Sequence, residues 1–177
     1  MIAHGASGKA ASMAAHVQGL ARRSIDATAI DLPLRRAEAA VSAFRQATAT
    51  MPEPSGDLIV SGQSYGGRVA SLLAAEMPGT YGGLICFSYP LHRPGVPDWD
   101  MRSSHWGSIS GPVLLLSGES DPFARIDLLR RAIAERLPEA RLVTYPRVGH
   151  SLKGVLDDAL DQVTAFVPQI ERERSAG

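Results

Sequence analysis

The sequence has few of the features that mark a secreted or membrane-bound protein. It contains one cysteine, Cys86, which lies inside an apolar run, so a disulfide framework is excluded and a buried, inert thiol is expected. No apolar run approaches the length that spans a bilayer, and the stretch from Met1 to Leu20 lacks the continuous apolar core of a secretion signal. We therefore expect a cytoplasmic protein that does not bind a membrane.

Neither sign of charge dominates the sequence. The 18 basic and 18 acidic side chains give a formal net charge of zero. The paired arginines lie far apart along the chain and do not form the basic stripe that captures a phosphate backbone. These pairs are Arg22-Arg23, Arg35-Arg36 and Arg130-Arg131. Nucleic acid is therefore not expected as a partner.

The order of apolar runs predicts one α/β domain over residues 1–177. A chain of this length, 45% hydrophobic, is long enough for one core and too short for two full domains. Short β-branched or leucine-rich runs alternate with segments of helical periodicity, which is typical of a mostly parallel sheet with helices on both faces. The six expected strands span 1–3, 25–30, 57–61, 83–88, 113–117 and 141–145. Five helices are expected between and after them, and Pro168 is expected to end the last one.

A Gly-x-Ser-x-Gly pattern supplies the first candidate for chemistry. The strand over 57–61 runs into Gly62-Gln63-Ser64-Tyr65-Gly66, and a helical pattern follows at once. In this strand, turn and helix context a nucleophile elbow holds its serine in a strained conformation, and the glycines prevent collisions between strand and helix. The alternative is a glycine-rich turn with an idle serine.

A serine nucleophile needs a base within hydrogen-bond reach and a third group that orients the base. The loops after the fifth and sixth expected strands carry Asp121 and His150, at the strand ends where catalytic groups gather in parallel sheets. The chain order of serine, acid and histidine is that of α/β-hydrolases and differs from the other common triad scaffolds. We therefore predict Ser64 as nucleophile, Asp121 as acid and His150 as base.

Other interpretations of these two partners stay open at this stage. Asp121 precedes a proline and could simply cap the following helix. Glu119 lies closer to the strand end and is a rival acid, and His150 could be a surface histidine in a turn.

The backbone amides of Tyr65 and Ala6 are the predicted oxyanion donors, one after the nucleophile and one in the loop after the first strand. That glycine-rich loop could instead cradle phosphate, but it lacks the lysine and serine or threonine ending of a P-loop. No metal or organic cofactor is expected, because the histidines His4, His92 and His105 lack a recognised ligand spacing.

Residues 89–107 interrupt the alternation of strands and helices and predict a long loop or small cap over the site. Its residues Tyr89, His92, Trp99 and Trp106 are predicted to bind substrate as one wall of a shallow, partly open apolar pocket. Such a pocket favours a small, short-chain ester as substrate. In the alternative interpretation, both tryptophans pack on the sheet as core.

Five blocks of the sequence resemble the small α/β-hydrolases of the dienelactone-hydrolase-like group, especially the testis-expressed protein thirty and nonspecific-lethal-complex subunit 3-like branch. The blocks are His4-Gly5-Ala6, Gly62 to Gly67, Ser88-Tyr89-Pro90-Leu91-His92 with Pro94-Gly95, Gly118 with Asp121-Pro122-Phe123, and Gly149-His150-Ser151. The resemblance implies the fold and a Ser-Asp-His site. Because some relatives serve in protein complexes, a non-catalytic interaction module is the alternative function.

The chain departs from that group at two places. True dienelactone hydrolases carry cysteine at the elbow, so lactone chemistry does not transfer to Ser64. Only Met1 to Ala3 precede His4-Gly5, so the amino-terminal strands are expected to be missing or shortened. An in-frame extension upstream of Met1 would lengthen the first strand, which is central in the sheet of the family.

Overall fold

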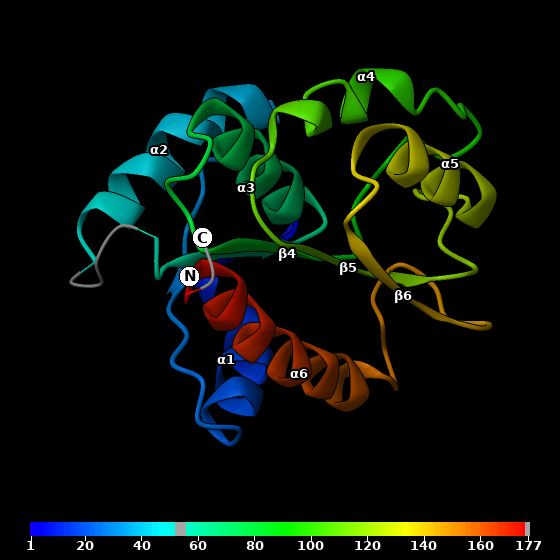
Figure 1. Ribbon diagram of the computed structural model, residues 1–177. Helices are drawn as coiled ribbons and strands as arrows, with labels where there is room; N and C mark the ends of the chain where they lie inside the picture. The colour runs from blue at the N-terminus through cyan, green and yellow to red at the C-terminus, as the bar shows by residue number, and fades with distance from the viewer. Residues whose placement is uncertain (52–55, 176–177) are drawn as a thin grey trace.

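The computed structural model describes residues 1–51 and 56–175, which form a six-stranded sheet with helices on both sides (Figure 1). All neighbouring strands are parallel, and the strand order is β2-β1-β3-β4-β5-β6. The strands are β1 (Ile2–Ala3), β2 (Ala29–Ile30), β3 (Ile59–Gln63), β4 (Gly83–Phe87), β5 (Val113–Gly118) and β6 (Arg141–Tyr145). The predicted α/β class with a parallel sheet of six strands is confirmed.

The helices divide between the two faces of the sheet (Figure 1). One face carries α2 (Ala37–Ala49), α3 (Tyr65–Glu76), α4 (Asp100–Ser103) and α5 (Ile126–Arg136), and the other carries α1 (Ala14–Ala21) and α6 (Leu156–Ser175). None of the helices in the described part of the chain is both long and apolar enough to cross a membrane.

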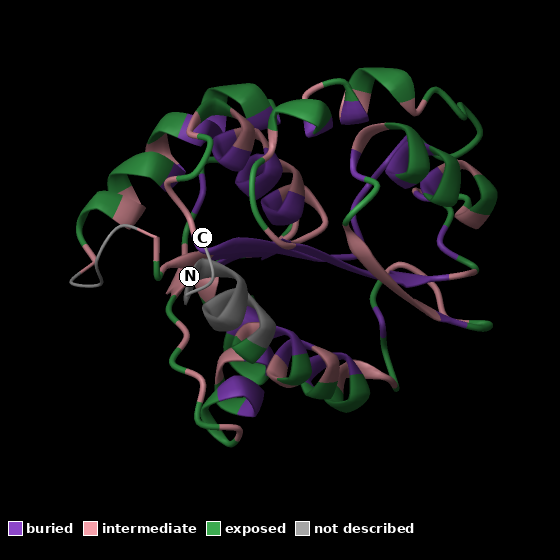
Figure 2. Ribbon diagram, viewed as in Figure 1, coloured by how far each residue is buried: buried purple, intermediate pink, exposed green. Residues whose placement is uncertain are grey.

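Two apolar cores lie on either side of the sheet, because successive strand residues point to opposite faces. Leu84 and Cys86 of β4 join the core under α2, α3 and α5, whereas Ile85 and Phe87 join the core under α1 and α6. Figure 2 shows the middle of the sheet as a buried layer between them, and every residue of β4 and β5 is buried. Cys86 is a buried free thiol, and burial raises its pKa, as expected for an inert cysteine.

The two strands nearest the amino terminus are short, as expected for the first of them. Strand β1 lies between β2 and β3, with Ile2 opposite both Ala29 and Ser61. The expected strand over residues 25–30 is wrong in length, since only Ala29–Ile30 pairs. The physical reason is that β2 has one neighbour, β1, and two residues of partner strand support only two residues of ladder.

The last helix does not end where it was expected to end. Helix α6 continues through Pro168 to Ser175, so the prediction that the proline terminates it is wrong. An internal proline removes one backbone donor at a cost of about 3 kcal/mol. Pro168 is exposed, and the turns before it are anchored in the core by Leu160, Val163 and Phe166, so packing holds the helix despite this loss.

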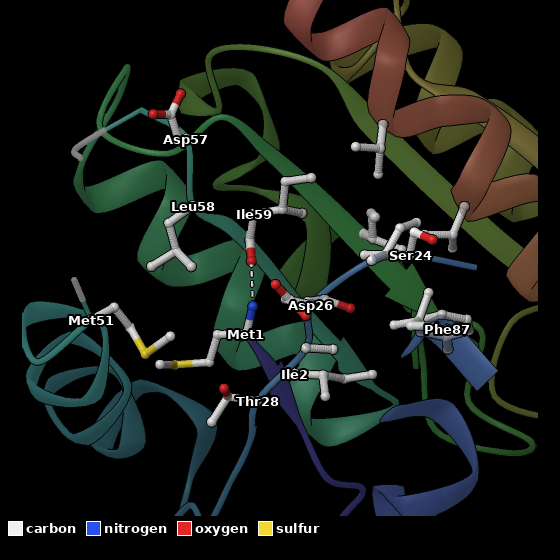
Figure 3. A pocket seen from close by; sticks show the side chains of 17 residues that line it. Met1, Ile2, Ser24, Asp26, Thr28, Met51, Asp57, Leu58, Ile59 and Phe87 are labelled. Carbon is white, nitrogen blue, oxygen red and sulfur yellow. Dashed lines mark hydrogen bonds between the residues drawn. The ribbon is translucent and has the colours of Figure 1, made fainter. Parts of the chain in front are cut away.

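A cavity of about 340 Å³ lies beside the amino-terminal ends of β1 and β3 (Figure 3). The Met1 ammonium group donates a hydrogen bond to the Ile59 carbonyl at its edge, over 2.8 Å. Leu20 of α1 and Val163 of α6 line it together with the strand residue Ile85. This cavity is therefore mainly apolar, and it borders the core under α1 and α6.

Candidate active site

Ser64 occupies a sharp turn between β3 and α3. Its backbone has φ 49° and ψ −111°, a conformation that non-glycine residues rarely adopt. A Cβ added at Gly62 would lie 2.3 Å from the Gly66 carbonyl carbon, and one added at Gly66 would lie 2.4 Å from the Ala3 carbonyl oxygen. Only glycine fits these two positions, and their small size lets α3 approach the sheet and present Ser64 at its carboxyl edge.

Ser64, His150 and Asp121 form one hydrogen-bonded chain. His150 Nε2 lies 2.8 Å from Ser64 Oγ, and His150 Nδ1 lies 2.7 Å from Asp121 Oδ2. Because an ionised carboxylate only accepts, Nδ1–H donates to Asp121, and Nε2 is left as the acceptor for the serine hydroxyl. Asp121 is buried, and the Phe123 ring lies 4.5 Å from the His150 ring, so both partners of the serine are held in place.

The structure distinguishes the two carboxylates that compete for the acid position. Glu119 accepts a hydrogen bond from Thr144 Oγ1 over 2.8 Å and lies 3.6 Å from Arg130, so its carboxylate is engaged elsewhere. Asp121 Oδ1 accepts the backbone N–H of Phe123 over 2.8 Å while Oδ2 faces His150. Asp121 does not cap α5, whose first residue is Ile126. Of the two, Asp121 therefore has the geometry of the orienting acid.

The two expected oxyanion donors lie beside Ser64. Tyr65 is the first residue of α3, and such an amide has no acceptor within its own helix. Ala6, in the loop after β1, lines the same pocket as Ser64 and Tyr65. The neighbouring Gly5 is so near that a Cβ placed there would lie 3.9 Å from the Ser64 Cβ. Both residues therefore border the space in front of Ser64.

His4 fastens the loop after β1, which contains Ala6. Its Nδ1–H donates to the Gly5 carbonyl over 2.7 Å, and its Nε2 accepts the Leu32 N–H over 3.0 Å. The side chain is buried and ties the loop after β1 to the loop after β2. In the described part of the chain no cluster of three or more histidine, cysteine, aspartate or glutamate side chains could hold a metal ion.

His92 makes the same kind of link on the other side of the site. Its Nδ1–H donates to the Arg93 carbonyl over 2.9 Å, and its Nε2 accepts the Arg125 N–H over 3.0 Å. Its own N–H donates to the Phe123 carbonyl over 2.9 Å. His92 was expected to bind substrate, but it is buried and joins residues 89–93 to the loop that carries Asp121. Its position makes it a support for that loop.

The expected aromatic wall is absent from the pocket that the described residues form around Ser64. Tyr89 and Trp106 are buried against each other with ring centroids 5.0 Å apart, and the Tyr89 hydroxyl donates to the Arg102 carbonyl. Trp99 is half-buried and lies under Arg136, whose guanidinium is 4.8 Å from its ring. Burial of apolar area against the helices outweighs exposure in a pocket, so Trp106 is core, as the alternative interpretation held.

A pocket of about 610 Å³ opens in front of Ser64. The segment over 89–107 does supply part of its wall, through Pro90, Arg93, Met101 and Arg102. The most frequent lining residue is arginine, which the sequence pattern did not single out. The five arginines are Arg35, Arg36, Arg68, Arg93 and Arg102. They come from three segments that lie far apart in the sequence, so no single local motif could have revealed the cluster.

Solved structures of similar fold include several hydrolases. A monoacylglycerol lipase of Paleococcus ferrophilus has a TM-score of 0.81 and 13% identity, covering 96% of this chain and 93% of its own. An esterase of Pyrococcus furiosus has a TM-score of 0.77 and 15% identity, covering 95% and 81%. A dienelactone hydrolase of Anabaena variabilis has a TM-score of 0.73 and 19% identity, covering 95% and 84%. At these identities the likeness is one of fold.

The match to a protein family is independent of these structures. Residues 1–167 match the family described as an alpha/beta hydrolase domain, which is nearly the whole chain. The parallel sheet, the elbow at Ser64 and the order of Ser64, Asp121 and His150 agree with that match. The chain therefore belongs to the alpha/beta hydrolase family.

Proposed function

We propose that this protein is a serine hydrolase that cleaves a small ester or related acyl compound through a covalent acyl-enzyme. The observation that carries the proposal is the chain of two short hydrogen bonds from Ser64 through His150 to the buried Asp121. A serine hydroxyl becomes a competent nucleophile when such a base accepts its proton.

In the first half of the reaction, Ser64 Oγ attacks the substrate carbonyl carbon while His150 Nε2 takes the hydroxyl proton. The carbonyl electron pair moves onto oxygen, and the amides of Tyr65 and Ala6 donate to the resulting oxyanion. The electron pair then returns, the bond to the alcohol oxygen breaks, and that oxygen takes the proton from His150 Nε2. The product of this half is an ester of Ser64.

In the second half, water replaces the alcohol. His150 Nε2 removes a proton from the water as its oxygen attacks the acyl carbon, and the same two amides hold the second oxyanion. Collapse breaks the bond to Ser64 Oγ, which recovers its proton from His150. Asp121 keeps the imidazole in the required tautomer and stabilises its positive charge in both halves.

The decisive test is labelling of the purified protein by a fluorophosphonate probe, which reacts with activated serines. We expect labelling in the wild type and none in Ser64→Ala. A folded wild-type protein that stays unlabelled would contradict the proposal and favour the alternative, a non-catalytic interaction module.

The size of the substrate follows from the pocket. The segment 89–107 supplies part of its wall, with the short helix α4 instead of a separate lid domain, and Met101 is the exposed apolar contribution of that segment. With an open wall of this kind, methylene groups of the substrate that extend past the rim add little binding free energy. In a series of p-nitrophenyl esters we expect activity to fall beyond short acyl chains, and a continued rise beyond octanoate would contradict this.

Within the alpha/beta hydrolases, we place the chain in the testis-expressed protein thirty and nonspecific-lethal-complex subunit 3-like branch. The block Ser88 to His92 supports this placement, since it lies outside the general hydrolase motifs. Its buried Tyr89 and His92 give it a structural role, in which it joins β4 to the loop of Asp121.

A further inference from the structure

The pocket in front of Ser64 carries a strong local excess of positive charge. Five guanidinium groups and one carboxylate, that of Glu38, line it, a formal balance of +4 in a chain whose net charge is zero. Among the residues that the structure describes, only Arg68 of these five forms an ion pair, with Glu38. Concentrating like charges without counter-charges costs folding free energy, so the arrangement calls for a ligand that offsets it.

Arg68 and Ser64 are related by one turn of α3. The Arg68 N–H donates to the Ser64 carbonyl over 3.0 Å, and both residues line the pocket. A negatively charged group bound at Arg68 and a carbonyl carbon held at Ser64 Oγ would therefore share the same pocket.

Two of the guanidinium groups are fixed in place. Arg68 Nη2 donates to Glu38 Oε1 over 2.5 Å, and Arg102 Nη1 donates to the Pro90 carbonyl over 2.8 Å. Both side chains are partly buried, and burial, followed by the charges of Arg68 and Arg93, lowers the pKa of Arg102. Arg68 Nη1 is buried and has no acceptor in the described chain, so its charge is incompletely balanced by the protein.

The remaining three arginines differ from these two. Arg35, Arg36 and Arg93 are exposed at the rim of the pocket. Exposed cations around a cleft attract an anion from solution, whereas fixed guanidinium groups bind a carboxylate or phosphate with paired N–H donors. The pocket thus has both an outer attracting ring and an inner pair of fixed cations.

We propose that the substrate is an anionic ester, whose carboxylate or phosphate group binds Arg68 and Arg102 while Ser64 attacks a carbonyl a few bonds away. The proposal rests on the hydrolase function proposed above and adds its substrate class. A half-ester of a short dicarboxylic acid carries both of these groups.

The test compares p-nitrophenyl hydrogen glutarate with its methyl ester, in which a methyl group removes the charge of the distal carboxyl group, and follows p-nitrophenol release above the rate without enzyme. We expect kcat/KM to be at least about tenfold higher for the charged compound, because charge-assisted hydrogen bonds to guanidinium are the strong ones. Equal rates, or faster cleavage of the methyl ester, would overturn the proposal.

Substitutions then show which arginines produce the preference for the charged ester. Arg68→Gln and, separately, Arg102→Gln are expected to reduce the preference for the charged ester about tenfold, and Arg68→Lys to restore part of it. The matched control is Arg22→Gln, an exposed arginine at the end of α1 on the other face of the sheet, which should leave the preference unchanged. A preference that survives in both pocket variants would contradict the assignment.

Protection from fluorophosphonate labelling separates the two possible anions. Slower labelling in millimolar glutarate than in inorganic phosphate assigns a carboxylate, and the reverse assigns a phosphate. Labelling that neither anion slows overturns the inference while leaving the hydrolase intact. If the protein is not labelled at all, the hydrolase proposal fails, and calorimetric titration with glutarate and phosphate decides the anion site alone: no binding heat, or equal binding by Arg68→Gln, rejects it.

Discussion

Two cavities at opposite ends of β1 and β3 differ in what lines them. At the carboxyl end, Ser64 and Ala6 share a pocket with five arginines, while at the amino end the cavity of Figure 3 is lined mainly by apolar side chains such as Ile59 and Ile85. In a parallel sheet, every strand delivers the loop that follows it to the same edge. Ser64, Asp121 and His150 follow three different strands and meet there, whereas the opposite edge receives the starts of the strands and the segments that lead into them.

The largest expected effect is the loss of ester hydrolysis when a side chain of the site at the carboxyl edge is removed. We expect Ser64→Ala and His150→Ala each to lower kcat by several orders of magnitude, and the double variant to be little worse, because the members of such a chain act as a unit. Ester hydrolysis by the three variants measures this. Losses that simply add would show that the two side chains act separately.

Next in size is the effect of the buried acid. Asp121→Asn is expected to lower kcat by about 10⁴ without unfolding the protein, since the amide disturbs the tautomer and orientation of His150. Circular dichroism checks the fold while the ester assay gives the rate. Glu119→Gln is the matched control, because Glu119 contacts Thr144 and Arg130; a greater loss in this control would mean that the acid is misassigned.

At the amino edge we expect stability to change with little change in chemistry. Ile85→Ala removes a buried side chain that already borders a cavity, so the free energy of unfolding should fall by about 2–5 kcal/mol. Denaturant unfolding measures the loss, and fluorophosphonate labelling of the folded variant should persist. The control Leu34→Ala, at an exposed apolar side chain, is expected to change stability by less than about 0.5 kcal/mol. If the folded Ile85→Ala protein is not labelled, packing at the amino edge affects the reactivity of Ser64 at the carboxyl edge, which would contradict this prediction.

Counted per histidine and per pH unit, the smallest expected effect is a pH dependence of stability from the buried His16 and the partly buried His105, which lie on opposite faces of the sheet. Burial lowers the pKa of His16 under α1 and of His105 beside α3 from 6.5 to about 4. Below pH 6.5 these two histidines therefore bind protons in the unfolded chain, whereas in the folded protein they stay neutral down to about pH 4. The stabilising contribution of each histidine is complete above pH 6.5 and is lost as the pH falls to 4, by about 1.4 kcal/mol for each pH unit.

His16→Leu isolates one half of that effect. His16 Nδ1 is buried without a hydrogen-bond partner among the described residues, so an apolar replacement should not destabilise the protein at pH 7. Urea unfolding at pH 7 and pH 4.5 should show a smaller difference in the variant than in the wild type. An unchanged difference would exclude His16 as a source of the pH dependence.

Much of the carboxyl edge could be predicted because its signals are local. Strands β4, β5 and β6 lie within one residue of the expected bounds, since each is a short apolar or β-branched run between turn residues. Strand β3 runs two residues further than its pattern, to Gln63, because pairing with Phe87 of β4 carries it up to the elbow. The end of α6 could not be predicted, since core packing of the helix overrides the tendency of a proline such as Pro168 to end it.

By itself, the sequence determined the parallel α/β architecture, the glycine-framed turn at Ser64 and the order of the three side chains that meet there. These follow from periodicity, from the steric demand of a strained turn and from the rule that strand ends share an edge. The tertiary structure alone decided that Asp121 and not Glu119 faces His150, that Trp106 is core, and that arginines surround the pocket. These outcomes depend on distances between segments far apart in the chain, and no local pattern encodes such distances.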